Sequence, residues 1–160
     1  MDKKKLLTIY DKLFQNKVNK YWKLHKKAIN SHGIRNILYS YRAKNIQNKY
    51  NSSFPIKKSI NYFNTPHGFS GIFISTDSQI GTDCTIYQHV VIGSNRVKGS
   101  KGYGAPIIGH NVMIGAGAKI IGNVKIGNNV RIGANCCVAT DIPNNATVVM
   151  EKPRIIIRTE

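Results

Sequence analysis

Aliphatic residues recur at every sixth position along much of the second half of the chain, and a small or branched residue stands four positions after each of them except Ile92. The first set is Ile74, Ile80, Ile86, Ile92, Ile108, Ile114, Ile120, Ile126, Ile132 and Val138. The second set is Ser78, Cys84, Val90, Val112, Ala118, Val124, Val130, Cys136 and Ile142. Ile56, Tyr62 and Gly68 extend the first set towards the N-terminus, less regularly. The pattern predicts two columns of inward-facing side chains over about residues 74–142.

A period of six fits neither a helix nor an ordinary strand. At about 3.6 residues per turn, residues six apart lie on opposite faces of a helix, and the recurring Gly, Asn and Asp residues would interrupt a strand. A solenoid accommodates the period, because each repeat forms one short side, three sides close a coil, and stacked coils bury the aliphatic column. We therefore predict an all-β solenoid, a parallel β-helix of hexapeptide repeats with Gly, Asn and Asp at its corners.

The repeat is broken once, between Ile92 and Ile108, which are sixteen residues apart. The intervening residues are polar and rich in glycine. Long loops on rigid scaffolds often carry function. The break predicts a loop extruded from the coil at about residues 94–105.

The first 54 residues have a helical period instead. A helix over about residues 3–29 is predicted from apolar residues spaced three or four apart: Leu6, Tyr10, Leu13, Phe14, Val18, Tyr21 and Trp22. A turn is expected at residues 30–33, where Gly33 can end the first helix, and a second helix from Ile34 to about Tyr50. The two helices either pack as a hairpin on the solenoid or lie on a membrane surface with their lysines towards anionic headgroups. We divide the chain into a basic α-helical region (1–54), a β-helix domain (55–150) and a basic C-terminal tail (151–160).

The chain is strongly basic, with 24 Lys and Arg residues against 7 Asp and Glu and a formal net charge of +17. Residues 1–60 hold 15 of the basic side chains and only two acids, Asp2 and Asp11. This charge favours an anionic partner such as anionic lipid or a phosphorylated substrate, although a solvated basic helix face explains it equally well. No recognised nucleic-acid motif accompanies it, and no nucleic-acid partner is expected.

Neither a membrane span nor a secretory signal is predicted, since no stretch of about eighteen apolar residues occurs. The three cysteines, Cys84, Cys136 and Cys137, provide neither a disulfide framework nor a Cys-x-x-Cys pair. The histidines lack the spacing of a metal site, so no metal is expected. The expected location is the cytoplasm, at the inner face of the membrane if the helices bind lipid.

The repeats and their flanking residues resemble the hexapeptide-repeat acyltransferases, and among them the serine acetyltransferase-like branch. The resemblance covers about residues 55–156 and rests on residues 85–93 (TIYQHVVIG), 106–119 (PIIGHNVMIGAGAK), 120–127 (IIGNVKIG), 141–145 (DIPNN) and 152–156 (KPRII). It implies that the β-helix is left-handed, that the protein is a homotrimer, and that acetyl-CoA binds in clefts between subunits.

Three histidines are candidates for the general base that the resemblance implies, the group that takes the proton of an acceptor hydroxyl as it attacks the thioester. His67 lies in PHGFSGI, where serine acetyltransferases carry Asp-His-x-x-Gly-Ile; here the gap before Gly71 is one residue longer and Pro66 replaces the acid. His89 is expected to point outward from its coil. His110 also points outward, where a turn Asn or Asp is common. We assign His67 and His89 as catalytic candidates and leave open which of them is the base.

The resemblance also implies where acetyl-CoA binds. Small residues at the entrance of the loop and on two successive coils let the pantetheine arm lie along the backbone, and basic residues near the C-terminus meet the nucleotide phosphates, unless they belong only to a basic tail. The candidates are Gly93, Ser94, Ala116, Ala134, Lys152 and Arg154.

Two departures from serine acetyltransferases direct the functional prediction. Ser52 stands where those enzymes carry the acid that orients the catalytic histidine, and Ala105 stands where a histidine precedes their Pro-x-Ile-Gly. We therefore predict an acetyl-CoA-dependent O-acetyltransferase that acts on a hydroxyl of a sugar or cell-surface polysaccharide precursor, like the enzymes that decorate capsular polysaccharide. Serine O-acetylation is the alternative, and a non-catalytic trimeric binding module with a basic arm is a second.

Overall fold

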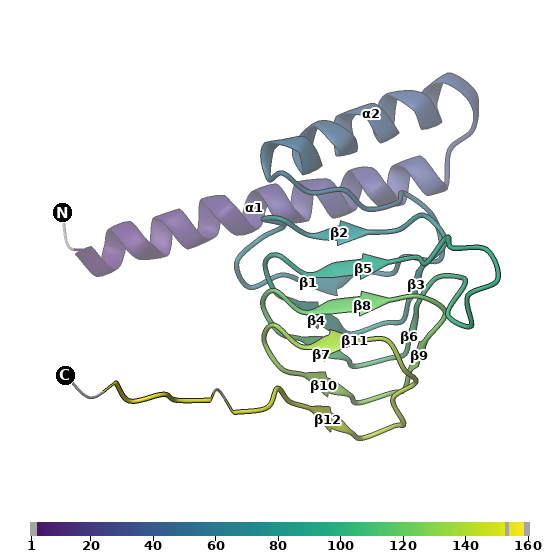
Figure 1. Cartoon of the computed structure of the whole chain (residues 1–160). Helices are drawn as coiled ribbons and strands as arrows, with labels where there is room; N and C mark the ends of the chain where they lie inside the picture. Colours follow the sequence, from purple (N-terminus) through teal and green to yellow (C-terminus); the bar gives the residue numbers. More distant parts are fainter. Residues whose placement is uncertain (1–2, 153, 159–160) are drawn as a thin grey trace.

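The computed structural model describes residues 3–152 and 154–158, and for residues 3–14 it describes the backbone alone. Two helices, α1 (Lys3–Ile29) and α2 (Gly33–Lys49), precede a stack of short strands (Figure 1). The strands are β1 (Phe63–Asn64), β2 (Phe73–Ile74), β3 (Gln79–Ile80), β4 (Cys84–Ile86), β5 (Val91–Gly93), β6 (Ile107–Ile108), β7 (Met113–Ile114), β8 (Lys119–Ile121), β9 (Lys125–Ile126), β10 (Arg131–Ile132), β11 (Cys137–Val138) and β12 (Thr147–Val148).

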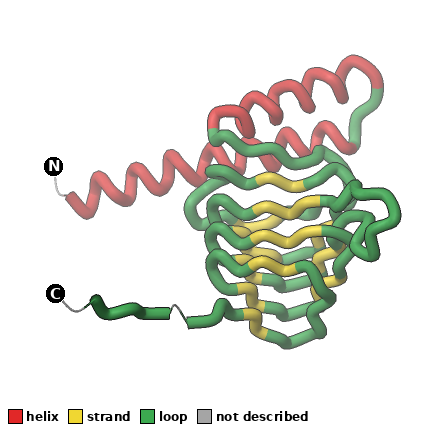
Figure 2. The backbone as a smooth tube through the Cα atoms, in the orientation of Figure 1, coloured by secondary structure: helices red, strands yellow, loops and turns green. Residues whose placement is uncertain are grey.

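The strands pair in parallel from coil to coil and form three sheets, with the orders β1-β4-β7-β10-β12, β2-β5-β8-β11 and β3-β6-β9. Paired residues such as Phe73 and Val91 are eighteen positions apart, so three hexapeptides make one coil (Figure 2). Where the pairing spans residues 94–105, as between Gln79 and Ile107, the separation rises to 28. The predicted left-handed parallel β-helix of hexapeptide repeats is confirmed.

The core of the solenoid consists of the two predicted columns. The aliphatic column from Ile74 to Val138 is at most 6% exposed, and the second column is equally buried from Ser78 to Cys136. Ile142, the last member of the second column, is only partly buried. Each coil thus contributes its apolar side chains to a single continuous core, which neighbouring coils shield from water.

The first coil does not follow the predicted phase. Ile56, Tyr62 and Gly68 were expected to continue the inward column, but Tyr62 is 50% exposed. Phe54 and Ile60 take the inward positions instead, each 1% exposed. Ile60 pairs with Ile80, twenty positions later, rather than eighteen. The prediction failed because the first coil has extra residues, which shift the hexapeptide phase.

Helix α1 closes the end of the solenoid that carries this first coil (Figure 1). Val18, Tyr21 and Trp22 from the predicted stripe are buried against it, while the side chains of residues 6–14 lie outside the described part. The ring of Tyr21 lies 5.0 Å from those of Phe54 and Phe69, in edge-to-face contacts. Such aromatic pairs contribute about 0.5–1.5 kcal/mol each beyond their buried area.

A buried glutamine joins α2 to both α1 and the first coil. The side-chain amide nitrogen of Gln47 donates to the hydroxyl of Tyr21 and to the carbonyl oxygen of Phe54, both at 2.9 Å. Its side-chain oxygen accepts hydrogen bonds from the backbone N–H of Phe54, at 3.3 Å, and from the ammonium of Lys44, at 3.0 Å. Gln47 has no exposed surface, so loss of these bonds would leave buried polar groups unpaired.

The outer face of α2 stays uncovered in the single chain. Ile34, Ile37, Leu38 and Tyr41 are exposed by between 49% and 84%. Of the two arrangements left open by the sequence, α1 therefore packs on the solenoid, whereas α2 packs on α1 and presents an apolar face outward. Within the described residues, neither helix has a stretch long and apolar enough to cross a membrane.

Candidate active site

The corner that holds His67 is wider than the equivalent corner of the next coil. Eight residues, 65–72, connect Asn64 to Phe73, whereas five residues, 86–90, connect their partners Thr85 and Val91 on the next coil. We call residues 65–72 the widened corner. Buried Phe69 anchors its backbone inside the solenoid, while His67 is exposed on a turn. The three additional residues therefore carry the histidine out of the coil instead of disturbing the stack.

His89 occupies the equivalent corner of the next coil, directly against the widened one. Its backbone N–H donates to the carbonyl oxygen of Ser70 at 2.9 Å. Its imidazole covers Gly71, so closely that a Cβ atom on Gly71 would overlap Nδ1 of the ring. Both Gly71 and His89 have left-handed backbone conformations, with φ of 63° and 60°. The packing of these two residues fixes where the His89 ring points.

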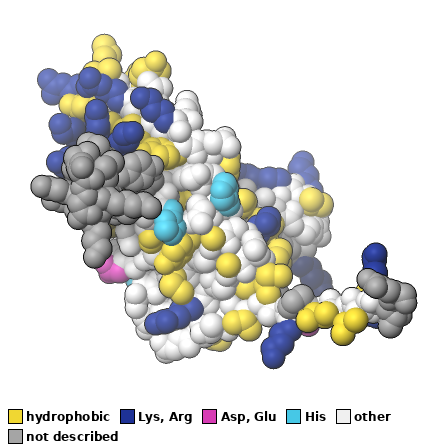
Figure 3. Space-filling view, turned by 90° about the vertical axis from the view of Figure 1, so that its left-hand side faces the viewer, with side chains coloured by type: hydrophobic (Ala, Val, Ile, Leu, Met, Phe, Trp, Pro, Cys, Tyr) yellow, Lys and Arg dark blue, Asp and Glu magenta, His cyan; other side chains and the backbone are white. Residues whose placement is uncertain are grey.

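The same corner repeats on two further coils. The N–H of Gly117 donates to the carbonyl oxygen of Gln88 at 3.0 Å, and the N–H of Asn135 donates to that of Ala116 at 2.8 Å. We call this line of corners, residues 65–72, 87–90, 115–118 and 133–136, the histidine edge. It faces the viewer in Figure 3, where histidine side chains lie together on the coil below the basic helical end.

The histidine edge thus brings together four of the predicted site residues, His67, His89, Ala116 and Ala134. His67 and His89 are both exposed. Ala116 is half-buried and Ala134 is exposed, so the edge carries small side chains at these two positions on the coils after the histidines, and we call this line the path of small residues. An exposed imidazole beside such a path can exchange a proton with a bound hydroxyl.

Tyr87 and Gln88 also lie on this edge, and sequence reasoning did not select them. The ring of Tyr87 is 5.9 Å from that of His67, centroid to centroid, at an angle of 49°. The side-chain oxygen of Gln88 is buried and has no hydrogen-bond partner among the described residues. Both residues immediately precede His89 in the chain, which is the one sequence signal that could have identified them.

Gly93 and Ser94 are not on the histidine edge. Gly93 is the last residue of β5, so these two residues lie at the opposite end of that strand from His89, on the next edge of the coil. A strand of three residues spans about 10 Å. Within a single subunit, the predicted acetyl-CoA contacts therefore lie on two different edges.

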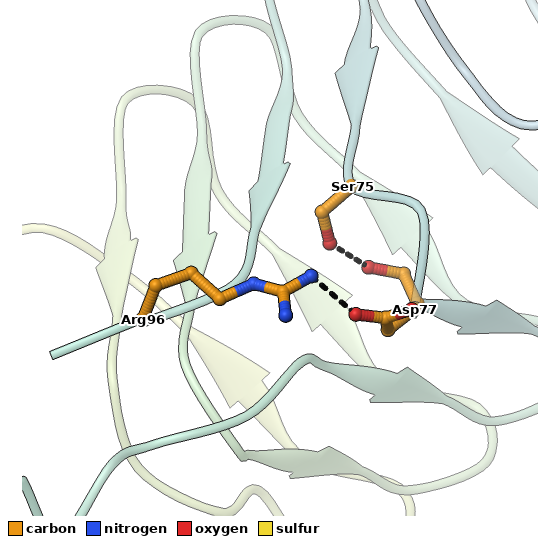
Figure 4. A network of polar contacts seen from close by, with 4 residues as sticks. Ser75, Asp77 and Arg96 are labelled. Carbon is orange, nitrogen blue, oxygen red and sulfur yellow. Dashed lines mark hydrogen bonds and ion pairs between the residues drawn. The ribbon is translucent and has the colours of Figure 1, made fainter. Parts of the chain in front are cut away.

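The segment after Gly93 is held against the coil by its own contacts. Asn95 and Gly104 exchange backbone hydrogen bonds of 2.8 and 3.0 Å. Arg96 forms an ion pair with Asp77 on the preceding coil, beside a 2.6 Å contact between the hydroxyls of Ser75 and Ser78 (Figure 4). Both partners of the ion pair are more than half exposed, so its contribution to stability is modest.

Lys152 and Arg154 belong to a C-terminal tail that is exposed in the single chain. The tail follows β12, which pairs with β10 through Arg131 and Thr147. The chain that follows β10 enters the histidine edge at residue 133. Because β12 stacks on β10, the tail that follows β12 starts at the same edge (Figure 1). It extends away from the solenoid in the single chain, and so the structure does not bring its two basic residues together with the histidines.

His110 and Ser52 have other roles in the fold. Nδ1 of His110 accepts the backbone N–H of Thr82 at 3.1 Å and lies 3.0 Å from the Thr82 hydroxyl, on a different edge from His67 and His89. The hydroxyl of buried Ser52 donates to the carbonyl oxygen of Gln47 at 3.0 Å. In the part of the chain that the structure describes, no three His, Cys, Asp or Glu side chains form a group that could hold a metal ion.

The comparisons with known proteins agree on one kind of enzyme. The family model described as bacterial transferase hexapeptide (six repeats) matches residues 105–140. The serine acetyltransferase of Synechococcus elongatus is 42% identical over 93 residues, which are 58% of this chain and 37% of that protein. This chain therefore spans well under half the length of that relative.

Two solved structures extend the similarity to the fold. Serine acetyltransferase isoform 3 of Entamoeba histolytica, solved in complex with cysteine, is 34% identical with a TM-score of 0.67, covering 88% of this chain and 49% of that one. A serine acetyltransferase solved in complex with CoA is 27% identical with a TM-score of 0.58, covering 82% of this chain and 51% of the other.

These similarities correct one prediction. A sugar or polysaccharide acceptor was expected because Ser52 and Ala105 replace two residues of serine acetyltransferases, but the matching relatives carry the name serine acetyltransferase. Two single substitutions were weaker evidence than the similarity of the repeats as a whole. The resemblance drawn from the sequence is confirmed: in its repeats and its fold, this chain is similar to the bacterial hexapeptide-repeat transferases and, among them, to the serine acetyltransferases.

Proposed function

We propose that this protein is an acetyl-CoA-dependent O-acetyltransferase whose acceptor is the hydroxyl of L-serine. The observation that carries the proposal is the histidine edge, on which His67 and His89 stand exposed on adjacent coils above a path of small residues. The names of its relatives support the same activity and the same acceptor. The structure solved with CoA supports the donor.

The chemistry requires one general base, and His67 is our assignment. A neutral imidazole accepts the proton of the serine hydroxyl while the hydroxyl oxygen attacks the acetyl carbonyl. As the carbon–sulfur bond breaks, the imidazolium returns that proton to the departing CoA thiolate. The products are O-acetylserine and CoA, and the histidine is neutral again. His89, held against Gly71, is placed to orient the acceptor at the same edge.

We further propose that the active protein is a homotrimer. The predicted donor contacts support it, because Ala116 and Ala134 lie on the histidine edge while Gly93 and Ser94 lie on the next one. If the second edge of a neighbouring subunit faces the histidine edge, all four residues line one cleft. Lys152 and Arg154 on the adjacent tail would then reach the nucleotide phosphates as cationic groups. Sedimentation equilibrium should give three times the chain mass, and a monomer that turns over would contradict the shared cleft.

Release of CoA thiol from acetyl-CoA tests the acceptor and the base together. The rate should rise on addition of L-serine, and His67→Ala should lower it by about two to four decades. His110→Ala is the matched control, because its ring lies on another edge, and its rate should be unchanged. Thiol release with a sugar but not with L-serine would refute the acceptor. An unchanged rate in His67→Ala, with a large loss in His89→Ala, would move the base to His89.

We also propose that the outer face of α2 contacts an anionic membrane surface. Its four exposed apolar side chains, from Ile34 to Tyr41, share the helical end of the molecule with most of the basic residues. An amphipathic helix of this kind binds by burying its apolar face and attracting anionic headgroups. Sedimentation with vesicles of phosphatidylglycerol, but not of phosphatidylcholine, is expected, and Ile37→Ser should reduce it. Equal sedimentation with both vesicles, or with neither, would overturn the proposal.

A further inference from the structure

A groove separates helix α1 from the first coil, away from the histidine edge. Its volume is about 940 Å³. It is lined by Lys58 and residues 60–62, which precede β1, whereas the widened corner follows β1. Residues from α1 form the opposite wall. Neither the proposed acetyl transfer nor the proposed membrane contact of α2 uses this groove.

The wall of the groove is basic and its floor is apolar. Lys20, Lys23, Lys26 and Lys58 line it, and no Asp or Glu is among the described residues that line it. Asparagines from both sides add neutral hydrogen-bonding groups: Asn16, Asn19, Asn30 and Asn61. Four cations, with no acid among the described lining residues, raise the local potential and attract an anion.

Two aromatic rings form the floor. Trp22 and Tyr62 lie 5.2 Å apart, centroid to centroid, and Tyr62 is half exposed although it is beside buried Ile60. An exposed tyrosine next to a tryptophan offers a surface on which a flat ring can stack. The floor therefore complements an aromatic body better than a fully hydrated ion.

Buried polar atoms in the same groove are left without partners. Nε2 of His25 and Nε1 of Trp22 are both buried and make no hydrogen bond among the described residues. His25 is 4% exposed, and its burial lowers its pKa to about 4, so that the imidazole is neutral at pH 7. Leaving such groups unpaired costs about 1–3 kcal/mol each. Because both nitrogens are closed off from solvent, a ligand in the groove reaches them only if the lining side chains shift.

We propose that this groove is a binding site for a phosphate monoester that carries an aromatic body. The lysines bind the phosphate as point charges, as ammonium groups commonly do. The aromatic body stacks on the exposed ring of Tyr62, beside Trp22. The site is separate from the acetyl-transfer site, so its ligand acts as an effector or as a tether and not as a donor.

The experiment uses Trp22, the only tryptophan of the chain, as its reporter. Phenyl phosphate should change the tryptophan fluorescence saturably, and the affinity should fall with added salt. Lys23→Gln and Lys58→Gln should each weaken binding at least about tenfold, since each removes one of the cations from opposite walls. Lys125→Gln, on the exposed part of β9, is the matched control and should bind normally. Circular dichroism checks that each variant is folded.

Inorganic phosphate and phenol, each tested alone, should bind at least about tenfold more weakly than phenyl phosphate, because each supplies half of the recognition. If inorganic phosphate bound as tightly as phenyl phosphate, the groove would be only a cluster of surface cations and the proposal would be wrong. If phenol bound as tightly, the groove would be purely apolar and the proposal would also be wrong. No saturable change, or the same loss in Lys125→Gln, would also refute it. A response to anionic vesicles alone would assign the groove to the membrane contact. Thiol release from acetyl-CoA, measured in parallel, keeps this outcome distinct from failure of the proposed activity.

Discussion

The left-handed backbone positions of the solenoid show how single residues shape the candidate site. Along the histidine edge these positions hold Gly68, Gly71, His89, Gly117 and Asn135, with φ between 58° and 72°. Glycine and asparagine adopt this conformation at little cost, whereas most other residues do not. At such a position His89 holds an imidazole on the edge in a fixed direction. The equivalent positions on the neighbouring coils hold glycine, which has no side chain, or asparagine, which has a short amide.

Gly71→Ala tests whether the position of the His89 ring matters. The added Cβ would displace the imidazole, so the rate of thiol release should fall, and the left-handed φ should cost about 1 kcal/mol of unfolding free energy. Gly33→Ala is the control, because Gly33 has a φ of 58° and nothing within 4 Å of an added Cβ. It should lose similar stability with no loss of rate, as measured by urea unfolding and the thiol assay. Equal rates in both variants would show that the ring position is unimportant.

His25 should make the fold sensitive to acid. Its pKa is lowered from 6.5 to about 4 in the folded chain, chiefly by burial. The unfolded chain therefore binds a proton more readily between these two values, and the free energy of unfolding should fall as the pH drops from about 6.5 to about 4. Urea unfolding at several pH values measures this slope. His25→Phe should flatten it, whereas His32→Phe, in the exposed turn between the helices, should leave it unchanged.

At the scale of elements, the repeat could be predicted wherever each side of the coil has six residues. Burial in two columns imposes that period, so every strand from β2 to β11 follows from it. The first coil could not be placed, because the extra residues of the widened corner shift the phase, and its buried apolar residues, Phe69 and Ile72, do not keep the spacing of six. His67 and His89 were each selected from the sequence, but their adjacency depends on that corner and was visible only in the structure.

The attachment of the helices depends on Gln47 more than on any surface contact. Gln47→Ala leaves the Tyr21 hydroxyl and the Phe54 backbone without their partners, so it should lower the unfolding free energy by about 2–3 kcal/mol. Gln79→Ala, at an exposed position of β3, should change it by no more than about 0.5 kcal/mol. Thermal unfolding followed by circular dichroism compares the two. Similar losses would show that the helices are held by the aromatic contacts alone.

At the scale of the whole molecule, the two ends of the solenoid differ. Helices cover the first coil, while the last coil ends at β12 with a partly exposed Val148 and a strongly exposed Val149. Contacts in a solenoid are only between neighbouring coils, so local stability should decrease towards the uncovered end. Hydrogen exchange should be faster for the amide of Arg131 than for that of Val91. Uniform protection of both would contradict this gradient.

Each coil of eighteen residues adds the same length to the solenoid. Because the widened corner stands near the covered end, a whole coil added or removed beyond Ala134 would change the length of the edge without moving His67 or His89. A shorter insertion would instead rotate everything after it to another side of the triangle, unless it looped out as residues 94–105 do. Chains of this type can therefore vary in the length of the solenoid while the position of the two histidines stays unchanged.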